Sequence, residues 1–225
     1  MIKNKEISRL NKIIKDKKSN ICLAADVNNL TSLFELIDYY KNDICILKLH
    51  YDIIDDFNKD IDFTVKKLNQ LKNEHNFLIW EDRKFADIGF IMEKQINKIS
   101  NWADLVSIHP IAGEESVKQI KDVGIILIGE MSSKEHLFNL DYQKKVINIS
   151  KKCDNVIGIV CQHKMTEDLL NIVPGISFNA NKDDKGQKYN LPEDRQFADI
   201  FVVGRALYLN KNRENIEKLK KMYKN

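Results

Sequence analysis

The charged residues with the clearest potential for chemistry lie in one run, Trp80-Glu81-Asp82-Arg83-Lys84-Phe85-Ala86-Asp87-Ile88-Gly89. Side chains two apart on a strand point the same way, so Asp82 and Lys84 should face one side and Arg83 the other. Asp87 comes three residues later, at the expected start of a helix. Acid, ammonium and acid in a confined space can hold a proton for transfer or stabilise a developing charge.

Lys48, on an earlier apolar segment, can join this group. The alternative interpretation is a surface salt-bridge network, in which each exposed pair contributes ~0–1 kcal/mol. That alternative fits poorly, because Asp82 and Lys84 lie on the side of an otherwise apolar strand that is expected to face inward.

A second group of residues is suited to binding a phosphate. Gly204-Arg205 follows the last expected strand, where glycine lets the backbone approach an anion and arginine can bind it with two hydrogen bonds. Pro174-Gly175 opens a long loop, Ser177–Pro192, which carries Gln187 and Tyr189. A loop of this length inside a compact domain is often an active-site lid.

These residues need a scaffold that brings distant segments together, and the sequence alternates between short β-rich runs and stretches with helical spacing. The runs are rich in Ile, Leu and Val without strict alternation, which is typical of parallel strands buried on both faces. Eight such runs separated by helices predict an α/β fold, a closed (β/α)8 TIM barrel; an open doubly wound sheet is the alternative. The expected strands are Ile21–Val27, Ile44–His50, Phe77–Asp82, Leu105–His109, Ile125–Gly129, Val156–Cys161, Ile172–Pro174 and Ile200–Val203.

Helical spacing marks the segments between and around these strands. The clearest apolar stripe consists of Leu30, Leu33, Phe34 and Ile37. A closing helix is marked by Ile216, Leu219 and Tyr223. An N-terminal helix that should cap the bottom of the barrel carries Ile7, Leu10, Ile13 and Ile14. With three prolines and eight glycines, no linker interrupts the chain, so residues 1–225 are expected to form a single barrel domain.

In a (β/α)8 barrel the active site lies at the carboxyl ends of the strands. The sequence places polar residues there and no comparable set at the strand starts. These residues are Asp26, Lys48, Asp82, Lys84, His109, Ser132, Gln162, Gly204 and Arg205. Loops are polar at both ends of a barrel, so the asymmetry between the ends carries the argument.

The bulk composition excludes several classes of function. The 36 basic and 33 acidic residues nearly cancel to +3, which gives no basis for nucleic-acid binding. The lysine-rich N-terminus lacks the apolar stretch of a signal peptide, and no segment approaches the ~20 apolar residues of a membrane span. We therefore expect a cytoplasmic protein that does not bind membranes.

The cysteines and histidines indicate neither disulfides nor a metal site. The four cysteines show no CxxC spacing, which favours reduced structural thiols: Cys22, Cys45, Cys153 and Cys161. The five histidines form neither HxH nor HExxH. No metal or other cofactor is expected.

With these segments in place, the chain resembles the eukaryotic-type orotidine 5'-monophosphate decarboxylases over nearly its whole length. The run from Glu81 to Gly89 is highly specific to this type, whereas the shorter DxKxxD within it is shared with a wider superfamily of decarboxylases and aldolases. The other markers are Leu23-Ala24-Ala25-Asp26-Val27, Leu47-Lys48-Leu49-His50, Glu130-Met131-Ser132-Ser133-Lys134, Pro174-Gly175-Ile176, Gly186-Gln187-Lys188-Tyr189 and Gly204-Arg205-Ala206-Leu207-Tyr208.

The resemblance implies decarboxylation of orotidine 5'-monophosphate to uridine 5'-monophosphate and CO2, the last step of de novo UMP synthesis, without a cofactor. It implies an alternating charged tetrad in which Lys84 protonates C6 of the pyrimidine. The tetrad consists of Lys48, Asp82, Lys84 and Asp87. The resemblance further implies a homodimer in which Asp87 reaches into the active site of the partner subunit.

The remaining roles implied by the resemblance concern substrate binding. Asp82 would lie beside the substrate carboxylate, and Asp26 and Lys48 would contact the ribose hydroxyls. Ser132 would contact the amide edge of the pyrimidine, and Pro174 would form an apolar wall near the leaving group. The phosphate would be held by Gln187, Tyr189, Gly204 and Arg205.

One position departs from the family pattern. The family usually has a threonine three residues after the Asp-Ile pair, contacting ribose across the dimer interface, and this chain has Ile91. Two alternatives stay open: a metal-dependent sugar-phosphate decarboxylase or synthase of the same superfamily, and a catalytically silent nucleotide-binding protein. The former enzymes lack the Ser132 and Gln187/Tyr189 features, and the intact tetrad argues against the latter.

Overall fold

The computed structural model describes residues 5–178, 186–209 and 211–223. Eight parallel strands pair in sequence order and close on themselves, because β1 pairs with both β2 and β8. The predicted (β/α)8 barrel is confirmed, and the open sheet is excluded. The strands are β1 (Ile21–Ala24), β2 (Ile44–Leu49), β3 (Leu78–Phe85), β4 (Leu105–Ile108), β5 (Gly124–Ile128), β6 (Val156–Val160), β7 (Leu170–Val173) and β8 (Ile200–Val203).

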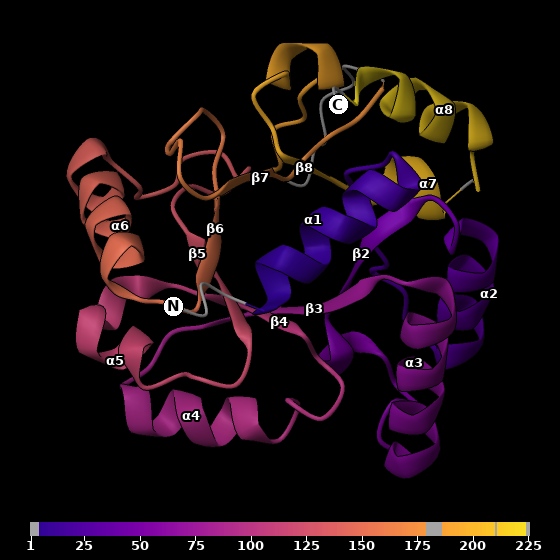
Figure 1. The fold of residues 1–225 in the computed structure, drawn as a ribbon, viewed down its shortest axis with the longest axis horizontal. Helices are drawn as coiled ribbons and strands as arrows, with labels where there is room; N and C mark the ends of the chain where they lie inside the picture. Colours follow the sequence, from indigo (N-terminus) through magenta and orange to yellow (C-terminus); the bar gives the residue numbers. More distant parts are fainter. Residues whose placement is uncertain (1–4, 179–185, 210, 224–225) are drawn as a thin grey trace.

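Helices surround this ring of strands (Figure 1). Four of them begin after an Asn or Asp whose side-chain oxygen accepts a backbone N–H three residues on, which satisfies a donor at the helix start. The α-helices are α1 (Lys5–Lys17), α2 (Leu30–Tyr40), α3 (Ile61–His75), α4 (Gly89–Asn97), α5 (Glu114–Lys118), α6 (Leu140–Lys152), α7 (Arg205–Tyr208) and α8 (Arg213–Met222). Short 3-10 turns are η1 (Tyr51–Ile53), η2 (Pro110–Ala112) and η3 (Pro192–Arg195).

The apolar core has two layers, because successive side chains of a strand point to opposite faces of the sheet. Cys22 and Leu78 belong to the layer inside the barrel. Their sequence neighbours Leu23 and Ile79 belong to the layer between the barrel and the helices. All four are fully buried. Burial of both faces explains why the strands read as continuous apolar runs in the sequence.

Helix α1 closes one end of the barrel, as predicted. Leu10 and Ile13 pack into the inner layer, and Figure 1 shows the helix lying across the ring of strands. Arg9 anchors it through an ion pair of 3.0 Å with Asp104 Oδ1, at the start of β4. The other Asp104 oxygen accepts the backbone N–H of Ile79 at 2.8 Å. Helix α1 is therefore tied to the amino ends of the strands, which leaves the carboxyl ends open.

Four further expectations from the sequence concern the fold, and the structure describes the residues of all but part of the last. Strand β3 extends to Phe85, three residues beyond the expected end at Asp82, and its pairing with β4 shifts after Glu81. The four cysteines are free and buried. None of the described helices is long and apolar enough to cross a membrane. Residues 179–185 of the expected lid lie outside the described residues.

The packing of α1 leads to a prediction for stability. Leu10→Ala should lower the free energy of unfolding by about 2–5 kcal/mol, because it leaves a cavity in the inner layer. Lys12→Ala, an exposed position of the same helix, should change it by less than ~0.5 kcal/mol. Urea unfolding followed by circular dichroism measures both. Equal, small effects of the two substitutions would show that α1 does not seal the barrel.

Candidate active site

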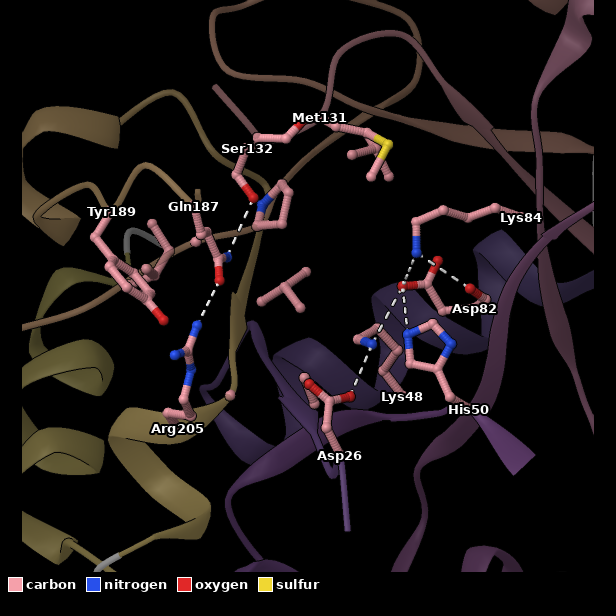
Figure 2. Close-up of a pocket in the computed structure, with 18 of the residues that line it drawn as sticks. Asp26, Lys48, His50, Asp82, Lys84, Met131, Ser132, Gln187, Tyr189 and Arg205 are labelled. Carbon is pink, nitrogen blue, oxygen red and sulfur yellow. Dashed lines mark hydrogen bonds and ion pairs between the residues drawn. The ribbon is translucent and has the colours of Figure 1, made fainter. Parts of the chain in front are cut away.

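A cavity of about 330 Å³ lies at the carboxyl ends of the strands, away from α1. Figure 2 shows two groups of polar side chains facing each other across it. The site residues expected from the sequence line this cavity, with the exception of Asp87. Those that line it are Asp26, Lys48, Asp82, Lys84, Ser132, Pro174, Gln187, Tyr189, Gly204 and Arg205.

Four charged side chains alternate in sign along one wall (Figure 2). Lys48 Nζ lies 3.2 Å from Asp26 Oδ1 and 3.2 Å from Asp82 Oδ2. Lys84 Nζ lies 2.9 Å from the same Asp82 oxygen and 3.2 Å from the Asp82 carbonyl oxygen. Lys48 and Asp82 are buried, whereas Lys84 is partly exposed. Asp82 is thus an anion shared by two ammonium groups.

Burial and neighbouring charge act against each other on these groups. Burial alone would raise the pKa of Asp82, but Lys48 and Lys84 overcome it and lower that pKa to about 2. Burial likewise opposes the charged form of Lys48, yet Asp82 and Asp26 raise its pKa above the usual value. The buried acid and the buried ammonium therefore both stay charged at neutral pH.

Lys84 reaches its place through an irregular backbone rather than through regular strand alternation. Its φ is +58°, a left-handed conformation that is uncommon for residues other than glycine. The Lys84 N–H donates to the buried Ser107 Oγ at 2.9 Å, which holds this conformation. Arg83 points away and pairs with Asp52. The prediction that the side chains of Asp82 and Lys84 lie on one side is confirmed, but the strand has an irregularity between Glu81 and Phe85.

The opposite end of the cavity presents a cation together with neutral polar groups (Figure 2). Gln187 lies between Ser132 and Arg205: its Nε2 donates to Ser132 Oγ at 3.2 Å, and its Oε1 accepts from Arg205 at 2.8 Å. The Arg205 guanidinium lies 5.3 Å from the centre of the Tyr189 ring. A guanidinium beside amide and hydroxyl groups is an arrangement suited to an anion.

Two of the glycines that line the cavity, Gly175 and Gly204, serve different purposes. Gly175 has a φ of +77°, and an added Cβ would lie 2.9 Å from the Lys188 carbonyl oxygen, so the turn after β7 requires glycine. At Gly204 an added Cβ would meet nothing closer than Ala24 Cβ at 3.6 Å, an ordinary contact. Packing does not demand glycine at Gly204, which lines the cavity and leaves its space open for a ligand.

Two polar residues expected at the strand ends support the cavity without lining it. Gln162 Nε2 donates to the Pro174 carbonyl oxygen at 3.4 Å, and Gln162 Oε1 accepts from Asn190 at 2.8 Å. His109 stacks on Phe138 with ring centres 5.9 Å apart. Burial and the charge of Lys84 lower the pKa of His109. Both residues hold neighbouring loops in place.

Asp87 is the expected site residue that this chain does not bring to its own cavity. Its side chain is exposed, and its Oδ1 accepts the backbone N–H of Ile88 at 2.8 Å. Ile91 lies in the first turn of α4, where its N–H donates to the Ile88 carbonyl oxygen at 3.0 Å. A contact of Asp87 with a partner subunit stays a prediction.

His50 is a cavity residue whose role the histidine spacing did not reveal. Its Nε2 lies 3.5 Å from Asp82 Oδ2. Burial and the charge of Lys48 lower its pKa to about 4, so the imidazole is neutral at neutral pH. Strand alternation carried the signal, because His50 is two residues after Lys48 and faces the same side. Trp80 and Met131 also line the cavity.

One group of described residues brings three possible metal-ligand atoms within 4.8 Å of one another: His50, Asp52 and Glu81. Two features argue against a metal ion there. Asp52 already pairs with Arg83. Burial raises the pKa of Glu81 to about 8, so Glu81 would have to lose a proton to bind a cation. We assign no metal to this group.

Fold and cavity together define a class: a (β/α)8-barrel protein with alternating lysines and aspartates at the carboxyl ends of its strands and an arginine among neutral polar groups opposite them. A family model described as "Orotidine 5'-phosphate decarboxylase / HUMPS family" matches residues 19–219. The chain belongs to this family.

Relatives across several eukaryotes agree with this assignment. The chain is 35% identical to an orotidine 5'-phosphate decarboxylase of Rhizomucor pusillus, over 94% of this chain and 86% of that protein. It is also 35% identical to the uridine 5'-monophosphate synthase of Bos taurus, over 94% of this chain but 47% of that protein. The chain therefore spans about half the length of the synthases it matches.

A solved structure supports the fold. The orotidine 5'-monophosphate decarboxylase of Methanocaldococcus jannaschii, complexed with the inhibitor BMP, superposes with a TM-score of 0.70 at 23% identity. The match covers 92% of this chain and 99% of the other.

Proposed function

We propose that this chain decarboxylates orotidine 5'-monophosphate to uridine 5'-monophosphate and CO2, the last step of de novo UMP synthesis. The observation that carries the proposal is the alternation of Asp26, Lys48, Asp82 and Lys84 along one wall of a cavity whose opposite end presents Arg205. Membership of the family and the names of the relatives support the same reaction. The cytoplasmic location expected from the sequence stays a prediction.

The two ends of the cavity orient a nucleotide in one direction. The phosphate binds at the cationic end, away from the charged cluster, where its remote binding energy can organise the reacting centre. Its ligands are Gln187, Tyr189, Gly204 and Arg205. Ser132, which already bonds Gln187, then contacts the amide edge of the pyrimidine.

The other end of the substrate meets the charged wall. Asp26 and Lys48, held together at 3.2 Å, contact the ribose hydroxyls. Pro174 provides an apolar surface beside the leaving group. This placement brings C6 of the pyrimidine toward Lys84, the partly exposed ammonium of the cluster.

Decarboxylation breaks the bond between C6 and the carboxylate carbon and leaves the electron pair on C6, in the plane of the ring. The pair cannot delocalise into the π system, so a fixed positive charge stabilises it. Lys84 supplies that charge and transfers a proton from Nζ to C6 as CO2 leaves. The 2.9 Å ion pair with Asp82 holds the ammonium in place for this transfer.

Asp82 also lies beside the carboxylate of the bound substrate, and the departure of CO2 relieves repulsion between the two anions. Two ammonium groups at 3.2 and 2.9 Å already neutralise much of the Asp82 charge. Stabilisation of the carbanion by Lys84 therefore contributes more than this ground-state repulsion.

The alternatives require features that this cavity opposes. A metal-dependent sugar-phosphate decarboxylase or synthase needs carboxylates that are free to bind a divalent cation. Lys48 occupies the space between Asp26 and Asp82, so an ammonium ion stands between the two cavity carboxylates. A catalytically silent nucleotide-binding protein would have no need for the charged cluster, and Ile91 is the feature that favours it.

We infer that the active form is a homodimer in which Asp87 enters the cavity of the partner subunit. Large apolar side chains directly follow Asp87 in the sequence and are exposed: Ile88 is 60% and Phe90 55% exposed. Clustered apolar exposure of this kind marks protein interfaces. Burying these side chains against a second copy would bring Asp87 to Lys84 of the partner subunit.

The proposed reaction predicts loss of orotidine 5'-monophosphate absorbance with the purified chain, at a rate that EDTA does not change. Lys84→Ala should slow turnover by about 10²–10⁴-fold or more, because it removes both the stabilising charge and the proton donor. Binding of uridine 5'-monophosphate, measured by calorimetry, should persist in this variant. Lys151→Ala, at an exposed position of α6, is the matched control. Undiminished turnover in Lys84→Ala, or activity that EDTA abolishes, would contradict the mechanism.

The proposed phosphate site predicts a substrate-dependent effect of Arg205→Ala. The variant should lower kcat/KM for orotidine 5'-monophosphate about 10–100-fold, since it removes a hydrogen bond to a charged group. It should leave the slow reaction of the phosphate-free nucleoside orotidine unchanged. Steady-state kinetics with the two substrates measure the difference, and equal losses on both would contradict this site.

The proposed sharing of Asp87 predicts complementation between two inactive proteins. Asp87→Asn and Lys84→Ala homodimers should each have little activity. A heterodimer of the two contains one site with both native residues, so random mixing should restore about a quarter of the native activity. Unfolding and refolding the two variants together, against each alone, provides the assay. An absence of recovery despite heterodimer formation would place Asp87 outside the partner's site.

A further inference from the structure

A carboxyl group lies buried beside the charged cluster without belonging to it. Glu81 adjoins Asp82 in the sequence, but strand alternation turns it the other way, into the layer between the barrel and its helices. Ile79, two residues earlier on the same strand, belongs to that apolar layer. Glu81 is 0% exposed. A carboxyl in such surroundings needs partners if it is to carry a charge.

The contacts of Glu81 are few. Its Oε2 accepts the backbone N–H of Tyr51 at 3.0 Å. Its Oε1 is buried and has no hydrogen-bond partner in the described part of the chain. The cation that acts on it from the cavity side, Lys48, is held by Asp26 and Asp82 at 3.2 Å each. One backbone donor does not compensate for burying a full negative charge.

The charged and titratable groups around Glu81 favour its neutral form. Asp82 adjoins it on β3 and Asp52 faces it from η1, so a charge on Glu81 would repel two carboxylates. Arg83 is engaged with Asp52. His50, at the end of β2, is neutral because burial and Lys48 lower its pKa to about 4. Burial, together with the two carboxylates, raises the pKa of Glu81 to about 8.

We propose that Glu81 is a positioning residue that acts as a neutral carboxylic acid, fixing the turn after β2 and keeping negative charge away from the back of Asp82. Its bond to Tyr51 holds η1, the turn that directly follows His50, and His50 contacts Asp82. While Glu81 is neutral, the Lys48 ammonium forms ion pairs with Asp26 and Asp82 and is not drawn toward a third carboxylate. An ionised Glu81 would attract Lys48 and weaken its hold on Asp82. The catalytic consequence rests on the proposed decarboxylase function, but the protonation state does not.

Glu81→Gln tests the catalytic consequence, because glutamine keeps the size and the acceptor for the Tyr51 N–H and cannot ionise. At pH 7 its kcat/KM should stay within about threefold of the native value. Above pH 8 the native kcat/KM should fall as Glu81 loses its proton, and the variant should lack this fall. Asp52→Asn removes a repelling carboxylate, so it should move the native fall to lower pH.

Stability provides a second readout that does not need catalysis. The pKa of Glu81 is raised to about 8 in the folded chain from an ordinary value of 4.5, so the unfolded chain loses this proton first. The native free energy of unfolding should therefore decrease as pH rises from 4.5 to 8, relative to Glu81→Gln. Glu74→Gln, at the exposed end of α3, is the matched control and should follow the native protein.

Infrared difference spectroscopy observes the protonation state directly. The native spectrum minus that of Glu81→Gln at pH 7 should contain the C=O stretching band of a protonated carboxylic acid. A difference spectrum with only carboxylate bands would overturn the proposal, and so would a Glu81→Gln variant that keeps the native pH dependence of activity. Mn²⁺ binding that Glu81→Gln abolishes would also overturn it, since a carboxylate ligand must be ionised. If the chain does not decarboxylate orotidine 5'-monophosphate, the spectrum and the stability measurements still decide the state of Glu81.

Discussion

Two ammonium groups share one buried carboxylate at the mouth of the barrel, with Lys48 at 3.2 Å and Lys84 at 2.9 Å from Asp82 Oδ2. Lys48 and Asp82 would each be costly to bury alone, and removing one partner of a buried pair typically costs about 3–5 kcal/mol because it leaves an uncompensated charge. The left-handed backbone of Lys84 is held within this arrangement, with the Ser107 hydroxyl fixing its N–H. Strained residues of this kind persist where their surroundings determine them, as they do in many active sites.

The two ends of the barrel differ, and this difference determines the surroundings of the charged cluster. Helix α1 fills the amino end with Leu10 and Ile13, so the interior below the cluster is lined by buried apolar side chains. The carboxyl end stays open, and the loops after β5, β7 and β8 supply Arg205 and neutral polar groups opposite the cluster. For the proposed nucleotide substrate, binding energy at one end of the cavity can therefore act on chemistry at the other end, since one ring of strands holds both.

Much of this arrangement was predictable from the sequence, and the failures have physical reasons. The hydrophobic runs predicted where each strand ends, and therefore that Lys48 and Arg205 lie at the same end of the barrel. The carboxyl ends of all strands meet at one end of a (β/α)8 barrel. The bulge at Lys84 was not predictable, since it depends on a hydrogen bond to Ser107, 23 residues later. His50 was overlooked because histidine spacing tests for metal motifs, whereas its position two residues after Lys48 placed it in the cavity. The environment of Asp87 depends on a second chain, which one sequence pattern cannot position.

Strand β3 places two adjacent carboxyl groups in opposite electrostatic environments, because side-chain alternation turns them to opposite faces of the strand. Asp82 faces the cavity, where two ammonium groups lower its pKa to about 2. Glu81 faces the apolar layer, where burial raises its pKa to about 8. Pairs of acids whose environments separate their pKa values are a common way to assign different states to similar groups. A single peptide unit thus supplies a permanent anion to the site and a neutral acid behind it. If both Glu81 and Asp82 were negatively charged, they would compete for the Lys48 ammonium. The alternation of charges in the cluster therefore depends on a neutral Glu81 as well as on the residues that line the cavity.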